Sequence, residues 1–411
     1  MQTYIDEKTP GIRTADGGIK LFPTFLLTVY VIAASVFSTV SLLVGTVVQS
    51  EYFALLLAVA MPVAGVAVLS KLTASIKPLV PFCIIVGLIL FMGSDLGVAS
   101  AIATILLLLA AAAYLFRNKL WYLSVFACAV SCVLTFILTK NILIAACSAA
   151  FLPTSLALCL SFEKKQQRVG AVCSMSVTLG ATLLLLFLAF IYLKEGSIYP
   201  SVIKGFFDSL RETLTTLISE TLVSASAQLE APISMADALS VTTSAVALAF
   251  NLFPAIITIL LFVISYVTHS LYISVISPTV EDNNDIIHAI SFKMSLGSAI
   301  VFRVAFFAAL ILDYEGLGLY ASAAQNIYLM LFPGLSLITF GFIGSFSKRK
   351  GASCLTSLIY FAILGIILFI PGVAASVAGV IISISAFVGA VLVIVSTVKS
   401  KIQNNENNDK K

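Results

Sequence analysis

The sequence predicts an all-α membrane protein: a polytopic bundle of about 12 transmembrane helices with one amphipathic helix on its outer side. Of the 411 residues, 60% are hydrophobic and 10% are charged, and the mean hydropathy is +1.11. Soluble globular domains carry about 25% charged residues, so the composition excludes that class. Apolar runs that meet or approach the roughly 20 residues needed to cross a bilayer recur from residue 21 to residue 398.

The N-terminal part begins with a short charged segment, residues 1–20, which we expect on the cytoplasmic side. The apolar run that follows has no small-residue cleavage site, which indicates a retained first span and not a signal peptide. Residues 21–193 then form an N-terminal bundle of about seven spans, with the boundaries 21–48, 52–70, 79–94, 96–116, 120–139, 142–162 and 169–193.

The long connection 194–242 is the main outer segment. Apolar side chains recur in it at helical spacing, among them Ile203, Phe206, Leu210 and Leu217, and charged residues alternate with them. This pattern predicts an amphipathic helix. Two interpretations stay open: the helix packs on the membrane surface or the bundle, or it forms a lid over a substrate entrance.

The C-terminal bundle covers residues 243–398 and contains about five spans, with the boundaries 243–268, 295–312, 318–346, 354–372 and 374–398. The inner connection 277–293 is acidic, and the polar tail 399–411 is expected in the cytoplasm. Small residues four apart, Ala375, Gly379 and Ser383, predict a close helix-packing face in the last span.

The distribution of Lys and Arg predicts that both termini lie inside. With alternating spans, 18 of the 23 basic residues fall on inner segments and four fall on outer segments. Such an excess of positive charge marks the cytoplasmic side. The asymmetry also favours an even number of spans.

Arg303 is the one basic residue inside a predicted span, SLGSAIVFRVAFFAALIL. A charge in the bilayer costs about 2.5–3.5 kcal/mol on insertion scales, so it should face a polar interior or a partner. The planar guanidinium suits a carboxylate or a phosphate. A structural arginine that bonds to carbonyl groups or an acid, or that snorkels to the interface, is the alternative.

Polar residues and helix breakers in the neighbouring spans predict a binding cavity. Asn251 precedes Pro254 in the eighth span, and Pro254 is expected to break the helix and free a carbonyl group. In the tenth span, Gln325 and Asn326 precede a second expected break at Pro333 and Gly334. We expect Arg303, Asn251, Gln325 and Asn326 to bind substrate.

Other kinds of chemistry find little support in the sequence. There is no Walker A, HExxH or GxSxG pattern, and the seven Cys and two His form no metal-ligand spacing. We therefore expect no metal, no cofactor and no nucleic-acid partner.

The segments NLFPAIITILLFVISYVTHSLYISVI, ISFKMSLGSAIVFRVAFF and QNIYLMLFPGLSLITFGFIGSFSKRK resemble the YybS-like bacterial membrane proteins, a family of unknown function. The resemblance covers residues 241–398 and places its motif positions at Pro254, Asn326, Gly334, Leu335 and Ser336. That family is similar in character to the small-molecule-binding subunits of energy-coupling-factor vitamin transporters. This likeness implies capture of a small metabolite with the help of a separate ATPase module.

Together these features predict a multi-pass protein of the bacterial plasma membrane that binds or transports a small anionic metabolite, and favour a non-enzymatic role. Two alternatives remain. The first is an envelope enzyme for lipid-linked sugars that uses Asp95, Asp313 and Glu315. The second is a membrane scaffold that binds partners through residues 201–223.

Overall fold

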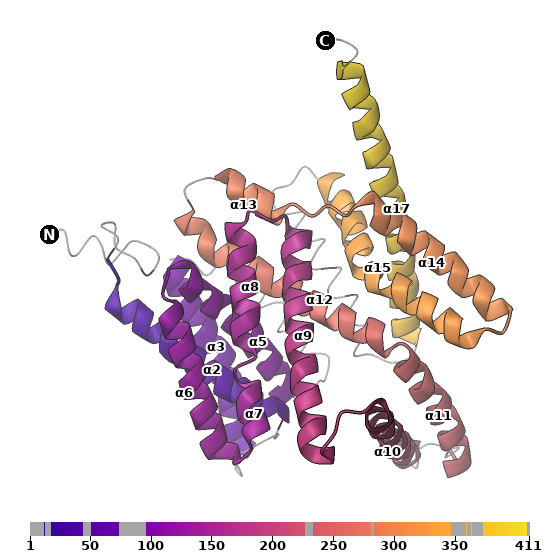
Figure 1. Cartoon of the computed structure of the whole chain (residues 1–411), viewed down its shortest axis with the longest axis horizontal. Coiled ribbons are helices and arrows are strands. Elements are labelled where there is room, and N and C mark those ends of the chain that lie inside the picture. The colour runs from indigo at the N-terminus through magenta and orange to yellow at the C-terminus, as the bar shows by residue number, and fades with distance from the viewer. Residues whose placement is uncertain are drawn as a thin grey trace. The chain divides into compact units, whose positions relative to one another are not determined.

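The computed structural model of the chain is mostly helical in the part that it describes, which is residues 12, 18–43, 51–73, 96–226, 233–280, 283–346, 359, 363 and 373–408. The α-helices, shown in Figure 1, are α2 (Leu21–Leu43), α3 (Glu51–Thr73), α5 (Leu96–Arg117), α6 (Trp121–Thr139), α7 (Ile142–Cys147), α8 (Phe151–Glu163), α9 (Arg168–Glu195), α10 (Pro200–Ser226), α11 (Met235–Asn251), α12 (Phe253–Ile276), α13 (Asn283–Ile290), α14 (Leu296–Tyr314), α15 (Gly318–Phe346) and α17 (Val373–Asn408). A short 3₁₀ helix, Ser277–Thr279, follows α12.

The predicted fold class, a polytopic bundle of transmembrane helices, is confirmed. Within the described ranges, nine helical segments are long and apolar enough to cross a membrane. Two expected spans, 79–94 and 354–372, lie outside the described residues apart from residues 359 and 363. The count of 12 and the inward orientation of the termini therefore stay predictions.

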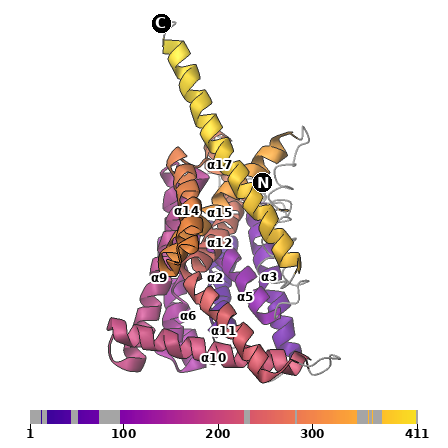
Figure 2. The ribbon, with the colours of Figure 1, turned by 90° about the vertical axis from the view of Figure 1, so that its right-hand side faces the viewer.

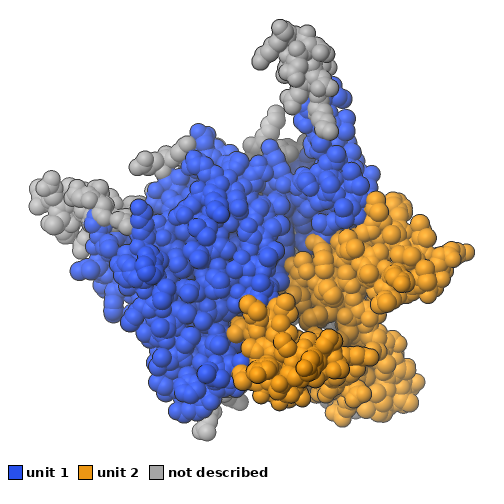
Figure 3. Space-filling model, in the orientation of Figure 1, with its two compact units in different colours: residues 1–183, 261–303, 331–411 blue, residues 184–260, 304–330 orange. Residues whose placement is uncertain are grey.

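The chain forms two compact units, coloured separately in Figure 3. Unit 1 comprises residues 1–183, 261–303 and 331–411, and unit 2 comprises residues 184–260 and 304–330. Four helices, α9, α12, α14 and α15, contribute residues to both units.

Helix α5 is the centre of unit 1. It packs against α2, α3, α6 and α8 (Figure 1), and its side chains from Leu106 to Leu115 are almost completely buried. Four consecutive alanines, residues 110–113, have small side chains, which lets neighbouring helix backbones approach α5 closely. Serine hydroxyls join the helices as well: the Ser155 hydroxyl on α8 donates to the Leu109 carbonyl at 3.1 Å.

Unit 2 is built around α10 and α11, which pack against each other (Figure 2). Helix α10 begins five residues after α9 ends. The aromatic rings of Phe206 and Phe207 on α10 pack against Phe187 on α9. The ring of Phe206 lies 5.6 Å from that of Phe187, and Phe207 contacts both Phe250 and Phe253. Leu217 and Ile218 remain exposed on α10, whereas Ser219 and Ser226 are buried.

Local sequence explains where several helices begin and end. Ser234 caps α11, since its side chain accepts a hydrogen bond from the backbone N–H of Asp237. Helices α9 and α14 are followed by Gly196 and Gly316, both with φ of +72°. Glycine adopts this left-handed conformation without the steric cost of a side chain, so it ends a helix readily.

The only tryptophan of the sequence, Trp121, opens α6. It is 59% exposed, and its ring meets that of Tyr122 edge-on at 6.4 Å. Aromatic residues at the end of a span are typical of the membrane–water interface.

Candidate functional site

Arg303 lies near the middle of α14, as the sequence predicts, and its side chain is half-buried. Among the described residues, the ion pairs are Lys165–Asp285 and Lys194–Glu195, so the structure gives Arg303 no carboxylate partner within those ranges. The residues beside it, Phe302 and Val304, are apolar. An anion that reached this guanidinium would find a charge that no described acid neutralises.

The structure brings Asn326 and Asn251 together, but through the backbone of Asn251. The Asn326 side-chain amide donates to the Asn251 carbonyl at 2.7 Å and to the Ser322 carbonyl at 2.9 Å. Its side-chain oxygen accepts the N–H of Ala255 at 3.0 Å. The amide therefore bridges the end of α11 and the start of α12.

The chain does break next to Pro254: α11 ends at Asn251, and α12 begins at Phe253 with Pro254 as its second residue. Proline suits the first turn, because the backbone N–H that it lacks would have no partner inside the helix. The expected eighth span, 243–268, is thus wrong in its boundaries: residues 243–251 belong to α11, and the helix able to cross the membrane is Phe253–Ile276. Asn251 is an exposed residue at the junction between two helices.

The expected break at Pro333 and Gly334 is absent. Both residues lie inside α15, which runs unbroken from Gly318 to Phe346. In a membrane, a break would leave several backbone groups without partners, so a span tolerates an internal proline and continues. Gln325 lies on the same helix, half-buried, next to Asn326.

The predicted binding residues are divided between the two units. Asn251, Gln325 and Asn326 belong to unit 2, and Arg303 is the last residue of its segment in unit 1. Of the acids in the enzyme alternative, Asp313 and Glu315 are exposed at the C-terminal end of α14, and Asp95 lies outside the described residues. Within the described ranges, no group of three or more His, Cys, Asp or Glu residues is arranged to hold a metal ion.

The start of α9 in unit 1 is part of a polar network that the sequence interpretation overlooks. Arg168 opens α9; its guanidinium donates to the Ser270 hydroxyl and lies 4.1 Å from the centre of the Tyr266 ring. Its backbone N–H donates to the Ser291 carbonyl at 3.2 Å. One turn earlier, Lys165 pairs with Asp285 of α13 at 2.9 Å. These contacts fasten the 164–168 connection to α12 and to the segment around α13.

His269 is the buried member of this region. Its side chain is 2% exposed, the Arg168 charge acts on it electrostatically, and its Nδ1 has no hydrogen-bond partner among the described residues. A buried polar atom without a partner costs about 1–3 kcal/mol. The signal in the sequence is the polar set Ser265, His269 and Tyr272 within an apolar helix, which falls on one face at helical spacing. Because the sequence analysis expects this span to end at residue 268, His269 and Tyr272 fall outside it and the pattern is missed.

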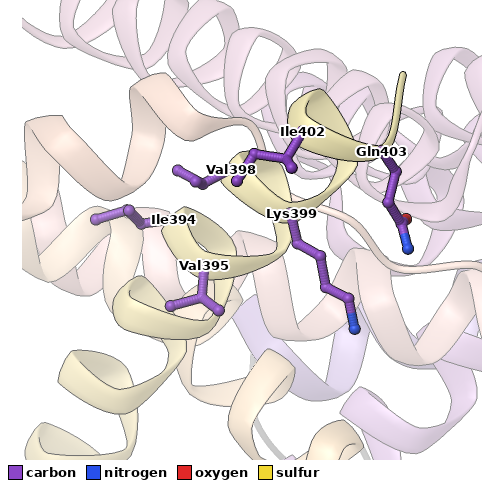
Figure 4. A pocket seen from close by; sticks show the side chains of 6 residues that line it. All are labelled: Ile394, Val395, Val398, Lys399, Ile402 and Gln403. Atoms are coloured by element: carbon purple, nitrogen blue, oxygen red, sulfur yellow. The ribbon is translucent and has the colours of Figure 1, made fainter. Parts of the chain in front are cut away.

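A hollow of about 510 Å³ lies along α17 (Figure 4). Its described lining residues are Ile394, Val395, Val398, Lys399, Ile402 and Gln403, all on this one helix. A single cation and an amide on an open helix face provide no converging set of groups, so this hollow is a weaker candidate than the polar network.

Comparison with known proteins assigns a family. The model of a family described as "Predicted membrane protein (DUF2232)" matches residues 83–381. No curated protein matches, and no solved structure matches. The match extends well beyond the C-terminal half in which the YybS-like resemblance was placed, and it gives the membrane character of the family but not that name.

Proposed function

Since the chain belongs to the DUF2232 family of predicted membrane proteins, we propose that it binds or transports a small anionic molecule across the membrane that contains it. We further propose that this membrane is the plasma membrane of a bacterium. Arg303 is the single observation that carries the proposal. It is a half-buried cation in the middle of an apolar span, and no described carboxylate pairs with it.

The energetics favour a functional role for such a residue. Intramembrane charges are costly and usually lie along substrate or ion paths or beside a counter-charge. A guanidinium binds carboxylates and phosphates through two parallel hydrogen bonds, whereas an ammonium group acts more like a point charge. The substrate class that fits Arg303 is therefore a small carboxylate or phosphate.

The test compares Arg303→Gln and Arg303→Lys with the wild type after purification in mild detergent. Small molecules released on denaturation are identified by mass spectrometry, and proteins that co-purify, such as an ATPase module, are identified in parallel. We expect an acidic metabolite with the wild type, a reduced amount with Arg303→Lys, and at least a roughly tenfold loss with Arg303→Gln, since each 1.4 kcal/mol of lost binding is tenfold.

Arg211→Gln is the matched control, because Arg211 is an exposed arginine on α10. It should retain the metabolite at the wild-type level. Equal retention by Arg303→Gln and the wild type, with both proteins eluting as one symmetrical species, contradicts the proposal.

A further inference from the structure

His269 lies in the interface between α9 and α12 of unit 1. The contacts on either side of it define that interface: the Ser176 hydroxyl bonds to that of Ser265 at 3.1 Å, and the Arg168 guanidinium bonds to Ser270. Ser265 is one turn before His269, and Ser270 directly follows it. The register therefore directs the imidazole between the two helices.

One face of α9 lies against α12, since Val172 packs with Tyr266 and Ser176 bonds to Ser265. Arg168, Val172, Ser176 and Gly180 recur every four residues along α9. Val172 is completely buried, and a side chain at Gly180 would come within 3.0 Å of Leu261 on α12. The two helices are thus closely packed above and below His269, yet the structure describes no protein partner for its Nδ1.

The neighbouring residue Thr268 also has a buried polar side-chain atom for which the structure describes no hydrogen-bond partner. It is completely buried, and its hydroxyl also has no hydrogen-bond partner among the described residues. If α9 and α12 only needed to pack, an apolar side chain of similar shape at either position would be as stable or more stable. These two neighbouring polar groups have no partner among the described residues, and a hydrogen-bonding molecule from outside the chain would satisfy both.

We propose that His269 and Thr268 form a buried binding site on α12 for a small molecule that offers hydroxyl or carboxylate oxygen atoms. The partner places one oxygen within about 3 Å of Nδ1, and the positive charge of Arg168 beside the imidazole favours the electron-rich oxygen of such a partner. Water and a small acidic solute share this chemistry and differ in source. The site is separate from Arg303 and does not depend on the function proposed above.

The two histidines of the sequence, His269 and His288, make the test direct. Protein labelled with ¹⁵N-histidine gives two imidazole signals, and His288→Gln assigns them. His288 is exposed on α13 and serves as the internal reference for full contact with water. Magnetisation transfer from water to each imidazole is measured on the intact protein in detergent, so this part of the test needs no change at the site.

If water fills the site, the His269 signal receives magnetisation from water at a rate comparable with that of His288, despite its burial. If a solute fills it, transfer to His269 is weak, and mass spectrometry of the wild type finds a retained molecule. The amount of this molecule falls about tenfold in His269→Phe and is unchanged in His288→Gln.

His269→Asn is the second variant, should His269→Phe not fold. An imidazole that receives no magnetisation from water, in a protein that retains nothing His269-dependent, overturns the proposal. Loss of a metabolite from Arg303→Gln alone would leave the proposed function intact and refute only the solute form of the site.

Discussion

Asn326 uses nearly all of its hydrogen-bonding capacity on backbone. Its amide and carbonyl groups satisfy the last carbonyl of α11 and an early N–H of α12, both of which lack partners inside their own helices. A ligand that needed the same side chain would have to displace these bonds. The residue is thus better explained as a bridge between helix ends than as the substrate-binding group that the sequence predicts.

We expect Asn326→Leu to lower the free energy of unfolding by about 2 kcal/mol or more, because it leaves two backbone groups of the α11–α12 junction without partners. Thermal unfolding in detergent measures the change. Gln325→Leu is the control: Gln325 is the adjacent half-buried amide, and this change should shift unfolding by less than about 0.5 kcal/mol. Equal shifts for the two variants would show that the bridge contributes nothing.

At the residue scale, the sequence predicts which residues lie in apolar helices, but it does not predict which residues they contact. That Arg303 interrupts an apolar helix follows from the sequence alone, since hydropathy and helical length determine it. That Asn326 meets Asn251 requires the relative positions of α15 and α11, which neither residue encodes locally. His269 escapes notice because hydropathy places the end of its span at residue 268, directly before His269, whereas α12 continues to Ile276.

Among the elements, α15 and α17 of unit 1 approach each other closely at Gly389. A Cβ at Gly389 would clash with the Leu335 carbonyl oxygen, and the Thr339 hydroxyl donates to the Ser385 carbonyl at 2.6 Å. The small-residue face predicted from Gly379 and Ser383 therefore has the right helix, but the close approach occurs farther along it.

Gly389→Ala should destabilise the protein by about 1–3 kcal/mol, since backbone cannot move aside as a flexible side chain does. Gly379→Ala is matched to it, because no described atom lies within 4 Å of the added Cβ. That variant should be neutral or up to about 1 kcal/mol more stable, as alanine favours helix over glycine. Unfolding midpoints in detergent rank the two, and a reversed order would refute the α15–α17 contact.

The rings of Phe206 and Phe207 hold α10 to the rest of unit 2. We expect Phe207→Ala to cost about 2 kcal/mol, less than a fully buried phenylalanine, and to accelerate amide hydrogen exchange throughout residues 200–226. Leu217→Ala on the same helix is the control, because Leu217 is 57% exposed and its removal should leave exchange unchanged. Exchange that is equally slow in both variants would show that the aromatic cluster does not anchor α10.

Element positions were largely predictable, and element ends were not. Long apolar runs identify α2, α5, α6, α9, α14 and α15, because only a helix satisfies its own backbone in hydrocarbon. The 243–251 segment is equally apolar but packs on α10 within unit 2. Hydropathy does not distinguish burial against protein from burial in lipid. It therefore assigns residues 243–251 to the same span as the first part of α12.

At the scale of the whole molecule, the sequence predicts the orientation of the chain in the membrane. With both termini inside, the basic residues crowd one side. In a variant whose cysteines are replaced, Thr213→Cys on α10 should react with a membrane-impermeant maleimide in intact cells. His288→Cys on α13 should react only after the cells are made permeable. The opposite pattern would invert the topology.

The position of Trp121 gives the intact chain a built-in optical probe. Since it is the only tryptophan, the indole fluorescence of the unlabelled protein comes from a single place, the start of α6. The residue is more than half exposed to its surroundings. Lipids that carry bromine at different positions along their acyl chains would quench this emission to different degrees. The depth of one end of α6 in a bilayer can thus be measured without any substitution or dye.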